Sequence, residues 1–427
     1  MDEVGSPVRV DFAEPVPRHI GEGLWRAPLR QIKPGGSFLP RTGYAALPLN
    51  SGRDIYLLGG QQGGRLRNDV WLLRLRPTGA EWLEVSAHRE PRRVEAGSST
   101  VLSGKWSGRE RFGFALATVR KGCMALYVCG GRNEQGVLED VWASEDNGTN
   151  WYCMAQHPPF GLRMEPGLLT VPGHYEQLVL CGGWAHGGSC LQPSGDVWVS
   201  TDAGMRWQEV AGLPTWAPRC LPVMAFLPGA TAMGGRRLLV FGGVCLSTFQ
   251  RVNITPGMLA DAWELEIDLH AAAGSGRRLA DVSAAGGLRP GFNGHCAAFD
   301  HFASHRAACC EGGDAGGFWA ESGALVAGLC GRLCMCSPTE PQVWRPAGFP
   351  GLDGDEKALC REDAKNSATH LALASGPRSQ CPRLFLFAAQ SVSASTDAEL
   401  HWQHRFLLRL GRALDAAGRR PPGALVG

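Results

Sequence analysis

One aspartate and its repeated surroundings are the first candidates for chemistry in this chain. Asp202 lies in WVSTDAGMRW, residues 198–207, between a hydroxyl residue and a glycine, and a tryptophan closes the segment. A second copy, WASEDNGTNW, covers residues 142–151, and a weaker third, SASTDAELHW, covers residues 393–402. A carboxylate in such a segment could be a catalytic acid or an acceptor for turn amides. The repetition and the turn-forming residue types favour the turn role.

Composition excludes several classes of function. With 42 basic and 40 acidic residues the chain is nearly neutral, so no global field favours nucleic acid or anionic lipid. No apolar run reaches the length of a membrane span, and the start, MDEVGSPVRV, lacks the features of a secretory signal. We therefore expect a soluble protein that is not secreted, with other proteins as partners.

The cysteines indicate a reducing compartment. There are 15 of them, an odd number in a chain of 427 residues, and Cys129 and Cys181 lie inside apolar runs, LYVCGG and LVLCGG. Such residues behave as small buried hydrophobes, whereas disulfide frameworks belong to short secreted chains. We expect a location in the cytoplasm or another reducing compartment.

A repeat marked by paired glycines organises the chain. Apolar segments end in Gly-Gly at Gly60, Gly131, Gly183 and Gly243. Each pair is followed by a polar loop of variable length and then by NDVW (68–71), EDVW (139–142), GDVW (195–198) or ADAW (260–263). An upstream apolar segment and a downstream alternating segment complete each unit, which predicts four short strands per unit.

This pattern resembles the kelch repeat, whose units are the blades of a β-propeller. The resemblance is strong over residues 41–268 and weakens after them, where Ala388 and Ala389 replace the glycines of the last unit. It implies an all-β propeller of about six four-stranded antiparallel blades, with seven as the alternative. We place an N-terminal arm at 1–40, the propeller at 41–410 and a tail at 411–427. The segments 23–29 and 406–414 are candidates for the strands that close the ring.

The segments around the aspartates resemble the Asp-box of sialidase-type propellers. The matching residues are Ser144, Asp146, Gly148 and Trp151 in one copy and Ser200, Asp202, Gly204 and Trp207 in the other. The resemblance implies structural turns in which the carboxylate accepts amide hydrogen bonds and the tryptophan anchors the hairpin. Glycine permits close approach of the backbone and positive φ, which is also what the Gly-Gly pairs require.

Enzymatic and metal-binding alternatives have weaker support. The chain has 5 tyrosines, too few for a sialidase-like or copper-dependent propeller in addition to their core positions. The segment 295–310 carries His295, Cys296, His301, His305, Cys309 and Cys310, and a further group is formed by Cys330, Cys334 and Cys336. Neither spacing is that of a standard zinc site. We therefore expect no catalytic residue, no metal and no cofactor.

The loops that follow the glycine pairs are the remaining candidates for function. In kelch proteins such loops gather on one face of the ring, where partners bind. They carry the predicted partner-binding residues Arg65, Arg67, Arg132, Trp184, His186 and Arg251. Arginine and tryptophan are enriched at binding hot spots, and arginines suit a carboxylate-bearing partner. The sequence therefore predicts a non-catalytic interaction module or scaffold subunit of a larger assembly. The alternative is a propeller enzyme or lectin-like domain with a metal or carbohydrate site at the ring centre.

Overall fold

The computed structural model describes most of the chain between residues 41 and 279. The gaps in this range are 42, 49–53, 77–78, 91, 97–98, 121–122, 188–189, 231–234, 247–255 and 260. Backbone strands are also described at 30–32, 283–284, 297–299, 325–329, 332–337, 340–346, 369–374, 383–391 and 402–410. Throughout these residues the regular secondary structure is β-strand, and none of it is a helix that could cross a membrane.

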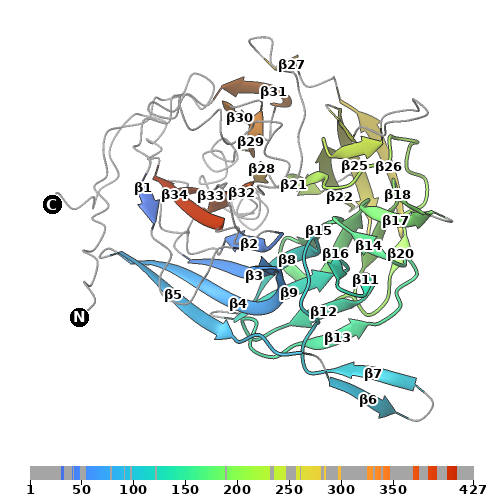
Figure 1. The fold of residues 1–427 in the computed structure, drawn as a ribbon. Helices are drawn as coiled ribbons and strands as arrows, with labels where there is room; N and C mark the ends of the chain where they lie inside the picture. Colours follow the sequence, from blue (N-terminus) through green and yellow to red (C-terminus); the bar gives the residue numbers. More distant parts are fainter. Residues whose placement is uncertain are drawn as a thin grey trace.

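Four antiparallel sheets of four strands follow one another along the chain (Figure 1). The first contains β2 (Ala45–Pro48), β3 (Asp54–Gln62), β4 (Arg65–Arg76) and β5 (Gly79–Ser86). The second contains β8 (Gly113–Arg120), β9 (Cys123–Cys129), β12 (Val141–Ser144) and β13 (Tyr152–Ala155). The third contains β15 (Gly167–Val171), β16 (His174–Cys181), β19 (Val197–Ser200) and β20 (Gln208–Glu209). The fourth contains β21 (Val223–Ala230), β22 (Arg236–Phe241), β25 (Ala262–Asp268) and β26 (Ala273–Arg278). This all-β architecture agrees with the four strands expected for each unit.

The four sheets share one register between their second and third strands. The tryptophan of each Asp-x-Trp segment lies opposite an apolar residue near the end of the glycine-pair strand. The pairs are Leu57↔Trp71, Val128↔Trp142, Leu180↔Trp198 and Val240↔Trp263. A shared register follows from the alternation of side chains between the two faces of a strand, because a slip of one residue would exchange the faces.

Two further sheets are built from the later strands and the N-terminal one. One has the order β1-β34-β33-β32, with β1 (Arg30–Ile32), β32 (Thr369–Ala374), β33 (Arg383–Ser391) and β34 (Trp402–Leu410). The other has the order β27-β31-β30-β29-β28, with β27 (Ser283–Ala284), β28 (Ala297–Phe299), β29 (Leu325–Leu329), β30 (Arg332–Ser337) and β31 (Glu340–Pro346). In the first of them Arg30 pairs with Leu408, so a strand within 1–40 joins one near the C-terminus. The candidate closing segment 23–29 lies outside the described residues.

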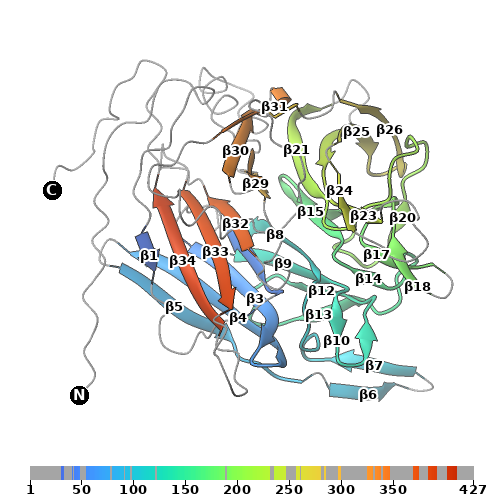
Figure 2. The ribbon, with the colours of Figure 1, turned by 45° about the horizontal axis from the view of Figure 1, so that its top comes forward.

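One edge strand of each of these six sheets lies beside an edge strand of the next (Figures 1 and 2). β2 contacts β8, β8 contacts β15, and β15 contacts β21. Contacts also join β21 to β28, β28 to β32, and β32 to β2. The apolar core of the first four sheets lies between neighbouring sheets. One cluster joins Leu58 and Val70 to Trp142, the next joins Tyr127 to Leu180, and a third joins Val199 to Val240. The second and third sheets are therefore stabilised by a neighbouring sheet on both faces.

The segments that follow the glycine pairs form hairpins rather than loops. In the second sheet the hairpin is β10 (Arg132–Asn133) with β11 (Gly136–Val137). In the third, β17 (Trp184–Gly187) pairs with β18 (Cys190–Pro193) and with β14 (Arg163–Met164). In the fourth, β23 (Val244–Leu246) pairs with β24 (Pro256–Met258). In the first sheet β3 and β4 themselves extend to the turn at Gly63 and Gly64. All four connect second and third strands, so they project from the same end of their sheets.

Candidate functional site

A buried arginine precedes each of the first four sheets and binds the aspartate of that sheet's Asp-x-Trp segment. We call these pairs the arginine clamps, and they are Arg41–Asp69, Arg109–Asp140, Arg163–Asp196 and Arg219–Asp261. In the second sheet the Nη1 of Arg109 lies 2.6 Å from Oδ1 of Asp140, and its Nη2 lies 2.9 Å from Oδ2. The same Nη1 donates to the carbonyl of Gly130 at 2.9 Å. All four arginines are at most 3% exposed. This bidentate geometry is the strong form of a charged hydrogen bond.

Each clamp aspartate has a second partner two residues further along the chain. The indole N–H of Trp142 donates to Oδ2 of Asp140 at 2.7 Å, and the equivalent tryptophans of the other three sheets do the same. Burial alone would raise the pKa of Asp140, but the charge and hydrogen bonds of Arg109 and the bond from Trp142 hold it below its usual value. The same balance lowers the pKa of Asp69 and Asp261. The Asp-x-Trp segment is therefore half of an ion pair between a linker and a sheet.

In the sequence an aromatic residue lies three positions before each clamp arginine, at Phe38, Trp106, Phe160 and Trp216. The structure describes the side-chain contact for the last three. The guanidinium carbon of Arg109 lies 5.8 Å from the ring centroid of Trp106, and Arg163 lies 5.8 Å from Phe160. Arg219 lies 4.8 Å from Trp216. Cation–π contact of this kind favours a desolvated guanidinium. The spacing aromatic-x-x-Arg is thus the sequence signal that could have revealed the clamps.

The glycine pairs make room for the next clamp. All eight glycines at 59–60, 130–131, 182–183 and 242–243 have positive φ. The N–H of Gly131 donates to the carbonyl of Arg163 at 2.7 Å, and a Cβ added at Gly130 would lie 2.3 Å from that oxygen. This confirms the expected close approach of a neighbouring backbone.

The linkers also bond to one another at the residue two positions after each clamp arginine. The N–H of Arg111 donates to Gly43, that of Glu165 to Arg111, and that of Leu221 to Glu165. All four residues have positive φ, between 50° and 62°, although three are not glycine. Non-glycine residues rarely adopt this conformation, and such residues gather at functional sites. Two of the three carry charged side chains, which directs attention to this line of linkers.

These charged side chains form what we call the linker face, made of Arg67, Arg111, Arg132, Trp184, Glu110 and Glu165. Arg111 forms an ion pair with Glu165, which also accepts a 3.0 Å hydrogen bond from the indole of Trp184. Arg132 donates from Nε to Glu110 at 2.7 Å. The side chains of Arg111 and Arg132 are 37% and 50% exposed, whereas those of Glu165 and Glu110 are 4% and 7% exposed. Buried carboxylates therefore hold partly exposed guanidinium groups in place.

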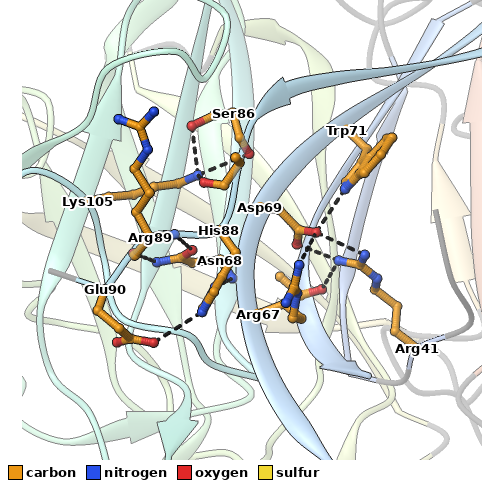
Figure 3. A network of polar contacts seen from close by, with 12 residues as sticks. Arg41, Arg67, Asn68, Asp69, Trp71, Ser86, His88, Arg89, Glu90 and Lys105 are labelled. Carbon is orange, nitrogen blue, oxygen red and sulfur yellow. Dashed lines mark hydrogen bonds and ion pairs between the residues drawn. The ribbon is translucent and has the colours of Figure 1, made fainter. Parts of the chain in front are cut away.

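Backbone pairing makes the linker face continuous across sheets. Glu110 and Arg132 exchange two hydrogen bonds, 3.1 and 2.9 Å long, and the N–H of Arg109 donates to the carbonyl of Arg67 at 3.1 Å. The segment 107–111 therefore lies between the strands that carry Arg67 and Arg132. The Nη2 of Arg67 lies 3.6 Å from Asp69, the carboxylate of the first clamp (Figure 3).

The structure brings together three of the predicted partner-binding residues, Arg67, Arg132 and Trp184. Arg65 and His186 are exposed on the neighbouring hairpins, and Arg251 lies outside the described residues. Sequence reasoning missed Arg111 and the carboxylates Glu165 and Glu110, which bind Arg111 and Arg132, because they lie in linkers rather than after a glycine pair.

A second polar network fixes the connection that leaves the first sheet (Figure 3). The side chain of the fully buried Asn68 accepts from the N–H of Arg89 at 3.0 Å and donates to the carbonyls of Arg89 and Trp106. Lys105 donates to the carbonyls of Ser86 and Ala87, at 3.3 and 3.1 Å. Burial lowers the pKa of Lys105 to about 8. Residues 86–90 and 104–107 are thereby held together at the start and end of this connection.

The two aspartate turns have the same internal hydrogen bonds. Asp202 accepts from the hydroxyl of Ser200 at 3.0 Å and from the N–H of Arg206 at 2.9 Å, while Ser200 accepts from the N–H of Gly204 at 2.9 Å. Asp146 accepts in the same way from Ser144 and from the N–H of Asn150, each at 2.8 Å. The indoles of Trp151 and Trp207 donate to the carbonyls of Gly148 and Gly204. Both glycines have positive φ.

The cysteines whose side chains the structure describes are free thiols. They are Cys123, Cys129, Cys153, Cys181, Cys220 and Cys245. Cys129 and Cys181 are fully buried, as expected, and burial raises the pKa of each to about 12. The part of the chain with described side chains contains no group of three potential metal ligands. The six His and Cys residues of 295–310 lie outside it, as does Cys330, and for Cys334 and Cys336 only the backbone is described.

Comparison with known proteins shows distant similarity to curated sequences, and no family model matches the chain. The chain is 26% identical over 330 residues to Adagio-like protein 1 of Oryza sativa subsp. japonica. The alignment covers 75% of this chain and 45% of that protein, so the chain spans less than half the length of this relative.

Proposed function

We propose that this chain is a kelch-type β-propeller of about six blades that serves as a non-catalytic protein-interaction module, as an adaptor or fixed subunit of a larger assembly. Two sets of contacts support the ring. Edge strands of six sheets are linked by contacts from β2 through β8, β15, β21, β28 and β32 back to β2. The pairing of β1 with β34 joins the two ends of the chain in one sheet. Closure of this kind stabilises units that are too small to be stable alone.

The linker face is the observation that supports binding. A guanidinium has five N–H donors, and the contacts to Glu165 and Glu110 use only some of those on Arg111 and Arg132. The buried carboxylates fix the position of each arginine before a partner arrives, which reduces the entropy lost on binding. We propose that this face binds a protein segment rich in carboxylates, with Arg67, Arg111 and Arg132 as the principal donors and Trp184 as an apolar neighbour.

The similarity to Adagio-like protein 1 supports the role as an interaction module, and the free thiols support the proposed location. A similar sequence occurs within a chain more than twice as long as the aligned part, as is expected of a module that functions beside other domains. The free, buried thiols support a cytoplasmic or other reducing location.

Native-size fractionation of a cell lysate, followed by mass spectrometry of co-migrating proteins, would test this proposal and name the partner. Affinity for that partner would then be measured by calorimetry for the wild type and for Arg111→Ala/Arg132→Ala. We expect a loss of about 2 kcal/mol or more of binding free energy, the cost typical of hot-spot arginines.

Arg206→Ala is the matched control. Its side chain is 90% exposed and lies in an aspartate turn at the opposite end of the third sheet from the hairpins, so its loss should leave affinity unchanged. A monomer without partners, or a partner bound equally well by the double variant, would contradict the proposal.

A further inference from the structure

The connection between the first and second sheets carries an additional hairpin. It runs from Ser86 to Arg109, whereas the next two connections run from Ala155 to Arg163 and from Glu209 to Arg219. Its middle forms β6 (Arg92–Ala96) and β7 (Ser99–Ser103), a sheet of two strands. Figures 1 and 2 both show this hairpin extending beyond the sheets, next to β13, which β7 contacts.

The base of this hairpin is held firmly. Asn68 binds the outgoing residue Arg89, and Lys105 binds the carbonyl of Ser86 (Figure 3). Asn68 also binds the returning residue Trp106, and Lys105 the carbonyl of Ala87. Asn68 and Lys105 are 0% and 6% exposed. The two-stranded arm therefore projects from a buried polar anchor, and its position relative to the sheets is fixed.

Among the described strands β6 pairs only with β7, and its outer edge presents main-chain groups for pairing. The register joins Ala96 to Ser99 across two intervening residues, and then Glu95 to Thr100, Val94 to Val101 and Arg93 to Leu102. Alternate residues of an antiparallel strand direct N–H and C=O to opposite sides. In a two-residue hairpin the pair beside the turn faces inward, so the main chain at Arg93 and Glu95 faces away from β7. Such an edge is a template for another strand.

We propose that β6 pairs antiparallel with β6 of a second copy of this chain, about a two-fold axis at Val94. In this register Arg93 of each copy lies opposite Glu95 of the other, and Val94 lies opposite Val94. The segment Arg-Val-Glu is thus self-complementary in charge, and opposite charges at directly opposed positions stabilise a strand pair. Both charged positions are also those whose main chain faces the free edge. A closed two-fold pair uses the same surface on both copies, which prevents open-ended association.

This dimer is independent of the proposed binding at the linker face. It joins two copies through β6, which lies outside the four-stranded sheets, and leaves Arg111 and Arg132 unused. The dimer would present two linker faces at once, which increases the apparent affinity for a partner with two matching segments.

Sedimentation velocity of the full chain tests the proposal. The wild type should show a species of twice the 45.7 kDa chain mass as concentration rises, because an interface this small supports only weak association. Glu95→Arg and Arg93→Glu each place like charges opposite one another, and each should weaken dimerisation at least about tenfold. Glu209→Arg, an exposed charge reversal on β20, should dimerise like the wild type.

Two experiments that restore opposite charges across the β6–β6 pair test its register. The double variant Arg93→Glu/Glu95→Arg should dimerise again, and the two single variants should form a mixed dimer when combined. Circular dichroism and thermal melting of each variant should match the wild type, because the hairpin lies outside the sheets. A monomeric wild type at every concentration, single reversals that still dimerise, or a double variant that stays monomeric would each overturn the proposal.

Discussion

The clamp of the second sheet gives the sharpest test of how the fold is held. Replacing Arg109 with alanine removes both hydrogen bonds to Asp140 and the bond to the carbonyl of Gly130. Arg109 is fully buried and the side chain of Asp140 is 8% exposed, so water cannot easily replace the lost donors. The carboxylate keeps the 2.7 Å bond from Trp142.

The expected cost is about 3–5 kcal/mol in the free energy of unfolding, the range for removing one partner of a buried ion pair. This exceeds the value of an exposed pair, about 0–1 kcal/mol, because the remaining charge is left without compensation in a low-dielectric interior. The double variant Arg109→Ala/Asp140→Ala should cost less than the sum of the two single variants, since it leaves no orphaned charge.

The stability lost in Arg109→Ala should also depend on pH. In the wild type the pKa of Asp140 is lowered, so its contribution is present above the usual carboxyl pKa and is lost only as pH falls through the lower folded value. Without Arg109, burial is less opposed and should raise the pKa of Asp140 above that of the unfolded chain. The folded variant then binds a proton more readily than the unfolded one. Its stability relative to wild type should therefore rise by about 1 kcal/mol or more between pH 7 and pH 4.

The free energy of unfolding of each variant can be measured at several pH values by urea titration, with tryptophan fluorescence as the signal. Arg206→Ala is the exposed control. A loss below about 1 kcal/mol, equal to that of an exposed pair, would refute the role assigned to the clamp. A loss of the expected size that stays constant with pH would refute the unpaired carboxylate as its cause.

Three more perturbations follow from the described contacts. Asp202→Ala should lower stability by roughly 1–3 kcal/mol, because turn amides lose their acceptor, and partner affinity should not change; weaker binding with unchanged melting would contradict the turn role. Gly148→Ala and Gly64→Ala both place a Cβ at positive φ, but only at Gly148 would it lie within 3.0 Å of neighbouring side chains. By urea unfolding, Gly148→Ala should cost roughly 1–3 kcal/mol more than Gly64→Ala, and equal costs would exclude the crowding. For Lys105, whose folded pKa is lowered to about 8, the unfolded chain holds a proton that the folded chain releases between pH 8 and 10. The unfolding free energy of the wild type relative to Lys105→Met should therefore rise over that interval, and a flat difference would contradict the burial of this amine.

Local spacing was sufficient to predict the strands of the first four sheets. A strand that ends in Gly-Gly and a strand that begins with Asp-x-Trp each carry their signal within a few residues, and the structure pairs them in one register. The internal bonds of the turn at Asp202 also follow local chemistry, since all its partners lie within four residues. The same holds for buried Cys129, whose apolar neighbours are adjacent in the sequence.

The candidate site depended on longer separations. Arg111 binds a carboxylate 54 residues away, and Arg109 binds one 31 residues away. No local pattern states which acid each arginine meets, and the polar segments after the glycine pairs gave no sign of their hairpins. Arg67, Arg132 and Trp184 were identified from residue type, but their common position became evident only through the linker 107–111 that lies between them.

The sequence by itself determined the repeat and the four strands of each of the first four sheets, because apolar alternation, turn glycines and aromatic anchors act over a few neighbouring residues. Only the tertiary structure decided which charges are buried and which are held at the surface. Whether an arginine is 0% exposed like Arg109 or 50% exposed like Arg132 depends on the packing of one linker between two sheets. The energy of an ion pair is set by this surrounding dielectric and by the position of a partner distant in the sequence, and neither is encoded in local spacing.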